Sequence, residues 1–181
     1  QGRAQLDADW NEQVEILLYL LREPLKEILG RGATNATTPG FVISLDELVD
    51  SKRLPDFNIG KGNYYVEGIL YENETPVKFS QQPDFPGGKA ELDATSDHDA
   101  CLVYLDGWER HITAAEDPSI REVALGGPDT STRMKTVWQV RLLPLSGDAA
   151  VDEKWPEQGE LRSLDAWKKF EAERSRNGHL A

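Results

Sequence analysis

The most regular hydrophobic pattern in the sequence lies near its start. In residues 10–29, apolar side chains recur at spacings of three and four, the period of one face of an α-helix. Asp9 precedes this run and Glu12 follows three residues later, as in a capping box. We therefore predict a helix over residues 10–29 that ends at Gly30, with a kink or a break at Pro24 because a proline ring clashes with the preceding turn. The apolar stripe consists of Trp10, Val14, Leu17, Leu18, Leu21, Leu25 and Ile28.

This predicted helix is apolar over more of its circumference than one contact face requires. Ile16, Tyr19 and Leu20 lie beside the main stripe and widen it. A helix that is apolar on several sides is buried by its own domain or by a neighbouring chain. We predict that it packs on a β-sheet and also contacts another protein, with Trp10, Ile16, Tyr19 and Leu20 as the candidate interface.

Three later segments alternate between apolar and polar residues as β-strands do. Residues 101–112 are apolar on both faces before Gly107 and alternate after it, which predicts a central strand with a bulge at Gly107. Residues 136–143 place three apolar side chains on one face and predict a second strand. If Trp138 on this face is buried, Trp138→Ala should lower the free energy of unfolding by about 3–5 kcal/mol. Residues 64–71 predict a third strand, joined to residues 56–59 by a turn at residues 60–63. The apolar face of the second segment consists of Trp138, Val140 and Leu142.

The C-terminal part has a linker composition over residues 146–159, followed by a helical pattern. Ser163 is placed to cap a helix through about residue 174, which carries Leu164, Trp167 and Phe170 on one stripe. Its later turns are almost wholly charged, so we expect it to pack through its first two turns.

These elements predict an α+β fold. An N-terminal amphipathic helix packs on an antiparallel β-sheet or small β-sandwich, and a peripheral helix follows at the C-terminus. The predicted division is a core domain over residues 1–146 and a linker with the C-terminal helix over residues 147–181.

Charge and composition narrow the classes of partner. The 181 residues include 32 acidic and 20 basic side chains, and the net charge of −12 disfavours nucleic acid and anionic membranes. The longest apolar run, residues 16–21, is far shorter than the ~20 residues that span a bilayer. The single cysteine, Cys101, lies inside a predicted strand, so we expect a buried and unreactive thiol. We predict a soluble chain that neither binds nucleic acid nor inserts into membranes.

A polar cluster near the end of strand 101–112 provides one candidate for catalysis. It contains one histidine and four carboxylates, and such side chains can bind a divalent cation or act as acid and base. Their spacing matches no metal-binding signature, and alternating polar residues are ordinary at the solvent end of a strand. The sequence also lacks the glycine motifs of phosphate sites and the nucleophile elbow of serine hydrolases. We predict no cofactor and no metal, and keep a carboxylate- or metal-dependent hydrolase as an alternative. The cluster consists of Asp106, Glu109, His111, Glu116 and Asp117, and the hydrolase would rest on the first three.

Tyrosines provide a second alternative. Tyr64, Tyr65 and Tyr71 surround Gly68 and could form a platform on which a sugar stacks, although strand aromatics lie more often in cores or interfaces. This pattern keeps a carbohydrate-binding module as a hypothesis. The connection over residues 114–133 is a second candidate contact surface because long loops in compact domains are usually functional or interfacial.

Four segments resemble a bacterial family of unknown function that is associated with phage-tail-like particles and extracellular contractile injection systems. They are residues 1–13 (QGRAQLDADWNEQ), 59–73 (IGKGNYYVEGILYEN), 103–111 (VYLDGWERH) and 117–130 (DPSIREVALGGPDT). The resemblance covers most of the chain up to Val140, and the part after Gly147 matches nothing known to us. Members of that family carry further residues ahead of the first block, so we expect the sequence to be part of a longer chain.

The resemblance implies a structural component of a phage-tail-like or contractile injection particle, with a role at the baseplate or in fibre attachment. We therefore predict a protein that is not an enzyme and that acts through contacts with other chains of such an assembly, with homo-oligomerisation as a further expectation. Its expected location is the cytoplasm during assembly and an extracellular or virion-like particle afterwards.

Overall fold

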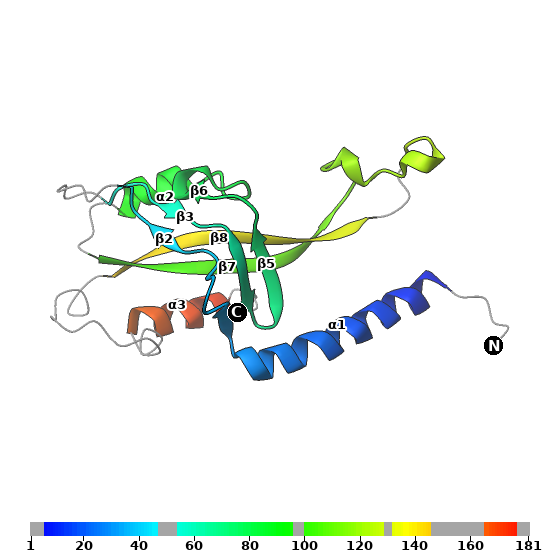
Figure 1. Ribbon diagram of the computed structural model, residues 1–181, viewed down its shortest axis with the longest axis horizontal. Coiled ribbons are helices and arrows are strands. Elements are labelled where there is room, and N and C mark those ends of the chain that lie inside the picture. The colour runs from blue at the N-terminus through cyan, green and yellow to red at the C-terminus, as the bar shows by residue number, and fades with distance from the viewer. Residues whose placement is uncertain (1–5, 47–53, 96–99, 129–131, 146–164, 177–181) are drawn as a thin grey trace.

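The computed structural model describes residues 6–46, 54–95, 100–128, 132–145 and 165–176 (Figure 1). The fold is α+β, as the sequence predicts. The first half contains α1 (Asp7–Leu29), β1 (Gly32–Thr34), β2 (Ile43–Ser44), β3 (Asn58–Ile59), β4 (Gly62–Val66), β5 (Ile69–Asn73), β6 (Val77–Lys78) and the 3₁₀ turn η1 (Phe79–Gln81). The second half contains α2 (Gly88–Thr95), β7 (Ala100–Ile112), the 3₁₀ turns η2 (Pro118–Ile120) and η3 (Val123–Leu125), β8 (Arg133–Leu145) and α3 (Asp165–Arg176).

The described strands form three small antiparallel sheets. The first has the order β1-β4-β5, the second has the order β2-β3-β6, and β7 pairs with β8 in a two-stranded ribbon. The predicted strands 101–112 and 136–143 are confirmed as β7 and β8, each somewhat longer than expected. Segment 64–71 does not join them in one sheet, because it belongs to the first sheet.

Segment 64–71 is also two strands rather than one. The chain reverses at Glu67 and Gly68, whose positive φ angles of 49° and 78° give the twist that suits a tight hairpin turn. The predicted hairpin turn at residues 60–63 is wrong, since β3 and β4 belong to different sheets. The apolar residues on both sides of Glu67 conceal this turn in the sequence.

The β7–β8 ribbon pairs one residue with one residue along its whole length, from Ala100 opposite Leu145 to Ile112 opposite Arg133. The bulge predicted at Gly107 is therefore wrong. Gly107 serves another purpose, because a Cβ atom there would overlap the ring of Tyr71 in β5. The glycine allows the ribbon to approach the first sheet closely.

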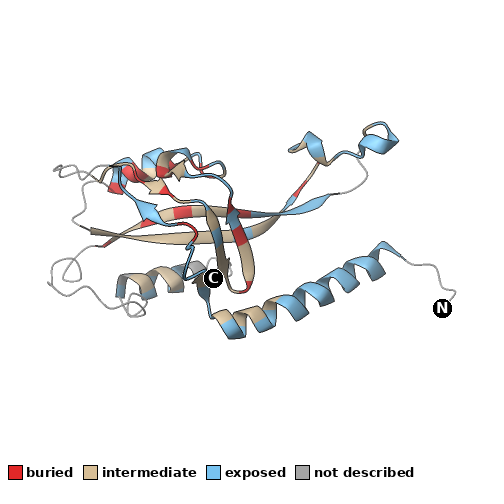
Figure 2. Cartoon of the chain, viewed as in Figure 1, coloured by how far each residue is buried: buried red, intermediate tan, exposed pale blue. Residues whose placement is uncertain are grey.

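The hydrophobic core lies where the two short sheets and α2 meet one face of the ribbon (Figure 2). Val140 and Leu142 are buried there, and Trp138 packs against the cluster as predicted, with its ring 4.9 Å from that of Phe41. Cys101 is half-buried against the same core, and burial raises the pKa of its thiol. The buried residues of the cluster are Phe41, Phe57, Ile59, Tyr71, Phe79, Phe85, Leu92, Val140 and Leu142.

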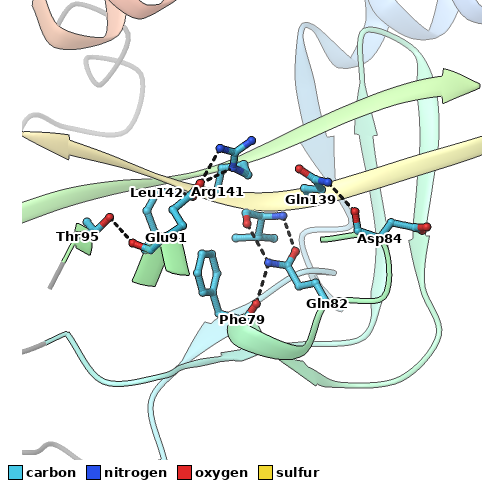
Figure 3. Close-up of polar contacts among 9 residues, drawn as sticks. Phe79, Gln82, Asp84, Glu91, Thr95, Gln139, Arg141 and Leu142 are labelled. Atoms are coloured by element: carbon cyan, nitrogen blue, oxygen red, sulfur yellow. Dashed lines mark hydrogen bonds and ion pairs between the residues drawn. The ribbon is translucent and has the colours of Figure 1, made fainter. Parts of the chain in front are cut away.

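Side chains of the segment around α2 close the outer edge of β8 (Figure 3). Gln82 accepts a hydrogen bond from the Val140 N–H at 2.6 Å and donates to the Val140 carbonyl at 2.9 Å. Glu91 of α2 accepts from the Leu142 N–H at 2.7 Å and from Arg141 Nε at 2.7 Å. These bonds replace a neighbouring strand. Helix α2 is missing from the sequence-based prediction because its eight residues begin with Gly88 and follow Pro83, Pro86 and Gly87, a composition typical of a loop.

Helix α1 differs in detail from the prediction. Its N-cap is Leu6 instead of Asp9, and the Asp9 carboxylate accepts the Leu6 N–H at 2.9 Å. The helix continues through Pro24 without a break, and it ends at Gly30 as predicted, where the Gly30 N–H donates to the Lys26 carbonyl. In the described residues, no helix has both the length and the apolar composition needed to cross a membrane.

The C-terminal helix α3 lies against the ribbon on the side of Tyr104. The rings of Trp167 and Phe170 stand 5.7 Å and 5.0 Å from the Tyr104 ring, so these two residues of the predicted stripe make this contact. Leu164, the third residue of the stripe, lies outside the described residues. The predicted linker over residues 146–159 and the predicted cap at Ser163 lie outside the described residues.

Candidate functional site

The C-terminal third of α1 is fixed to the strands by ion pairs. Arg22 donates two hydrogen bonds to Glu109 of β7, at 2.9 Å from Nη1 and 2.5 Å from Nη2. Lys26 Nζ lies 3.1 Å from the Glu67 carboxylate, which also accepts from Arg31 Nε at 2.9 Å. The hydrogen bond that Lys26 donates to the Glu67 carboxylate raises the pKa of Lys26. Exposed pairs of this kind add little stability, but together they fix the direction in which α1 leaves the strands.

A close backbone contact completes this attachment. Gly68, at the tip of the β4–β5 hairpin, lies so near Arg22 that a Cβ atom would overlap the Arg22 carbonyl oxygen. Its φ of 78° is also one that other residues rarely adopt. Glycine at this position therefore permits both the hairpin turn and the close approach of α1 to the hairpin.

Beyond this attachment, the helix stands away from the rest of the chain. All residues from Leu6 to Leu21 are exposed, and α1 contains no buried residue (Figure 2). The four residues predicted as an interface follow this rule: Trp10 is 61% exposed, Ile16 46%, Tyr19 64% and Leu20 61%. The expectation that the sheet covers the apolar stripe is wrong for this part of α1.

Most of the apolar stripe lies on a different side of α1 from the attachment, and Leu25 is the stripe residue that is half-buried on the attached side. The half-buried residues near the strands are Arg22, Leu25, Lys26 and Leu29, which share one side of the helix. At 3.6 residues per turn, the stripe through Leu17, Leu21 and Ile28 is centred roughly a quarter turn from them. Ile28 is 79% exposed although it lies within the attached third. The fold therefore turns the apolar stripe toward solvent.

The residues predicted for a hydrolase are used in structural contacts or lie apart. Glu109 is held by Arg22, and His111 Nε2 lies 3.0 Å from Thr132 Oγ1. Glu109 and His111 share one face of β7, whereas Asp106 lies on the other because successive strand residues alternate. In the part of the chain that the structure describes, no three metal-ligating side chains come together.

The two remaining acidic candidates stabilise local structure. Glu116 binds Arg110 at 2.6 Å, and this hydrogen bond, helped by one from the Thr113 N–H, holds the pKa of Glu116 below its usual value. Asp117 caps η2 by accepting the Ser119 N–H at 3.0 Å, and its bonding to Ser119 lowers its pKa. Both carboxylates belong to the turns that follow β7.

The three tyrosines do not form one flat platform. Tyr71 is 1% exposed and lies in the core, so its ring is not available to a sugar. Tyr64 is the cross-strand partner of Tyr71 and contacts Phe41 edge to face at 6.3 Å, while Tyr65 points to the opposite face of β4. Only Tyr64 and Tyr65 retain partial exposure among these three.

The connection after β7 exposes a second, smaller apolar area. Val123 is 84% exposed and Leu125 is 69% exposed, both in η3. Hydrogen bonds hold this tip: Glu122 accepts the Ala124 N–H at 3.2 Å, and the Gly127 N–H donates to the Glu122 carbonyl at 2.9 Å. Residues 129–131 of the predicted contact surface over residues 114–133 lie outside the described residues.

Comparison with known protein families identifies the family of this chain. Residues 1–162 match DUF6519, a family of unknown function. The chain belongs to this family. Neither a characterised protein nor a solved structure matches it. DUF6519 membership agrees with the sequence-based resemblance to a family of unknown function, and the association with tail-like particles stays a prediction.

The residues that orient α1 in this DUF6519 chain were not among the sequence-based candidates. Arg22 and Lys26 are the basic residues of α1, and their spacing of four places them on one side of the helix. In a helix otherwise rich in Asp and Glu, this pair marks the side that meets acidic partners. Glu67 and Glu109 gave no comparable signal, because acidic residues occur throughout the chain.

Proposed function

We propose that this DUF6519 protein is a structural component of a phage-tail-like or contractile injection particle and that it acts through contacts with other protein chains. Its role is at the baseplate or in fibre attachment. The four family-like segments support the kind of assembly. The observation that supports the mode of action is the exposed apolar surface of α1.

The size of that surface makes a permanently uncovered state unfavourable. Burial of a large aliphatic or aromatic side chain contributes about 1.5–3 kcal/mol. Trp10, Leu17, Leu20 and Leu21 are each more than half exposed, so a partner that covers them gains several kcal/mol. Large contiguous apolar areas on soluble chains mark interaction sites. The binding surface in this proposal is the apolar side of α1.

The proposal is tested by particle incorporation. The tagged chain is produced in cells that also express the sheath, tube and baseplate genes of a tail-like particle, and the purified particles are analysed for the chain by mass spectrometry. We expect wild-type chain in the particles and at least a tenfold loss for the double variant Trp10→Ser/Leu20→Ser. The matched control is Val123→Ser/Leu125→Ser, which removes exposed apolar side chains elsewhere and should be incorporated normally.

Two results contradict the proposal. One is the absence of wild-type chain from particles that are otherwise complete. The other is normal incorporation of the Trp10→Ser/Leu20→Ser variant, which would show that α1 is not the contact surface. No contact among the described residues favours the two alternative hypotheses, a carbohydrate-binding module and a hydrolase.

A further inference from the structure

The apolar side of α1 has the spacing that two packed helices share. Trp10, Val14, Leu17, Leu21 and Ile28 follow one another at intervals of four, three, four and seven residues. Steps that alternate between four and three residues, with the interval of seven counted as two steps across Pro24, keep side chains on one line along a helix pair and allow knobs-into-holes packing. We call these five residues the α1 seam. Each of them is exposed, from 38% at Val14 to 79% at Ile28.

An isolated helix of this kind requires a neighbour. Helices in water gain little stability from backbone hydrogen bonds alone, because nucleation is costly, and most helical stability in proteins comes from packing of an apolar face. Helix α1 is 23 residues long and buries none of them. Its regular seam therefore calls for another helix against it.

The positions beside the seam show which helix fits. The flanking positions from Trp10 to Leu25 are uncharged, and Glu27, beside Ile28, is the charged flanking residue at the C-terminal end of the seam. The uncharged positions are Asn11, Gln13, Leu18, Leu20 and Leu25. In helix pairs, charges at these flanking positions select an unlike partner and exclude a like one. From Trp10 to Leu25 nothing on the seam or directly beside it repels an identical helix.

We propose that α1 packs, along its seam, against α1 of a second copy of this chain. The inference rests on the proposed function in one respect, the use of α1 as a contact surface, and it names the partner. A second copy supplies the same uncharged seam, so the contact is self-complementary, as interfaces in symmetric oligomers are. The copies are held together by apolar packing alone.

The arrangement of the chain leaves room for this contact. In Figure 1, α1 extends from the strands as an arm, with its N-terminal half distant from the sheets. Because the attachment through Arg22 and Lys26 lies on another side of the helix, the body of each copy is displaced from the seam. Among the residues that the structure describes, none of the ion pairs that hold α1 to the strands involves a seam residue.

Charge predicts how salt acts on the pairing. Each copy has a net charge of −12. Helix α1 carries the acidic residues Asp7, Asp9, Glu12, Glu15, Glu23 and Glu27. Long-range repulsion between two such copies is screened by salt, whereas apolar packing is not weakened by it. Self-association should therefore become stronger between low and moderate NaCl concentration, which is opposite to an assembly held by ion pairs.

The test is the mass of the purified chain by sedimentation velocity and light scattering over a range of concentrations and at two NaCl concentrations. We expect two or more copies for wild type and a single copy for Leu17→Gln/Leu21→Gln at the same concentration. Val123→Ser/Leu125→Ser should associate as wild type does. All four replaced side chains are exposed, so we expect the thermal unfolding midpoint of each variant to stay close to that of wild type. An unchanged midpoint shows that the fold is kept.

Cross-linking places the contact. Cysteines are introduced on the seam in a Cys101→Ser background, as Val14→Cys or Leu21→Cys, and the proteins are mildly oxidised. If the two helices run parallel, each single variant should form disulfide-linked dimers by itself. If they run antiparallel, dimers should form when the two variants are mixed. Glu12→Cys, off the seam, should link at least tenfold more slowly. A wild-type chain that is monomeric at every concentration and salt overturns the inference. If that monomer still enters particles through α1, the proposed function stands and its partner is a different protein.

Discussion

At the scale of single residues, one amide side chain takes the place of a strand. Gln82 is 4% exposed, and its amide bonds both the N–H and the carbonyl of Val140 while also donating to the Phe79 carbonyl at 3.0 Å. Buried backbone groups without partners are costly. Gln82 therefore closes the edge of β8 at the point where this strand enters the core.

The hydrogen bonds of Gln82 predict a large effect on stability when this one side chain is truncated. Gln82→Ala leaves the buried N–H and carbonyl of Val140 without partners, and we expect a loss of about 2–4 kcal/mol in the free energy of unfolding. Gln81→Ala, at an exposed neighbouring position, is the control and should cost less than about 0.5 kcal/mol. Urea unfolding followed by circular dichroism measures both. Equal stability of the two variants would show that the Gln82 bonds are not needed.

Trp138 combines packing with one hydrogen bond. Its ring stands edge to face against Phe41, and its Nε1–H donates to the Glu72 carbonyl at 2.9 Å. Because Trp138 is half-buried, Trp138→Ala should cost about 3 kcal/mol, the low end of the range for large aromatic truncations. Trp138→Phe keeps most of the packing and should cost about 1 kcal/mol. A loss below 1 kcal/mol for the alanine variant, measured by urea unfolding, would contradict the assigned face of β8.

Tyr71 predicts how stability changes at alkaline pH. Burial, helped by the nearby Glu109 carboxylate, raises the pKa of Tyr71 from 10.0 to about 12. Between these values the unfolded chain loses the proton more readily than the folded chain, so the stabilising effect is complete below pH 10 and is lost as pH rises through about 12. Tyr71→Phe lacks the group, and its stability should decline less steeply over this window. Parallel declines of the two proteins would refute the assignment.

At the scale of elements, the sequence predicts those whose hydrophobic period is long and regular. Helix α1, β7 and β8 have such periods, and their positions are correct to within a few residues. The β4–β5 turn at Gly68 and helix α2 are missed because their evidence is local: a single glycine in an apolar run, and eight residues after a Pro/Gly-rich stretch. Period alone also does not reveal which side of α1 faces the strands, since ion pairs between distant residues decide it.

The attachment of α1 is itself testable through glycine. Gly68→Ala introduces both an unfavourable φ and an overlap with the Arg22 carbonyl, so we expect a loss of about 2–3 kcal/mol in the free energy of unfolding. Gly30→Ala has a similar φ of 74° with no atom near the new Cβ, and should cost about 1 kcal/mol from backbone strain alone. The difference between the two variants, measured by thermal or urea unfolding, reports the contact between α1 and the hairpin. Equal losses would mean that the close contact does not constrain the chain.

At the scale of the whole molecule, helix α1 extends as an apolar arm from a well-packed body formed by the strands and α2. The body closes its strand edges with Gln82 and Glu91 and buries its aromatic core, whereas α1 leaves its apolar seam in solvent (Figures 1 and 2). The sequence predicted the candidate interface on α1 from its excess apolar width. It gave no means to choose between coverage by the sheet and coverage by another chain, because both require the same pattern of residues.

The most direct test of this account is amide hydrogen exchange over residues 7–21 in the assembled state. The assembled wild-type chain, in particles or as the self-associated form, is compared with the monomeric Leu17→Gln/Leu21→Gln variant. We predict at least tenfold slower exchange in this segment on assembly, because packing suppresses local opening of the helix, and unchanged exchange in β7 and β8. Equally fast exchange of residues 7–21 in both states would show that no partner covers α1 and would contradict its role as the contact surface.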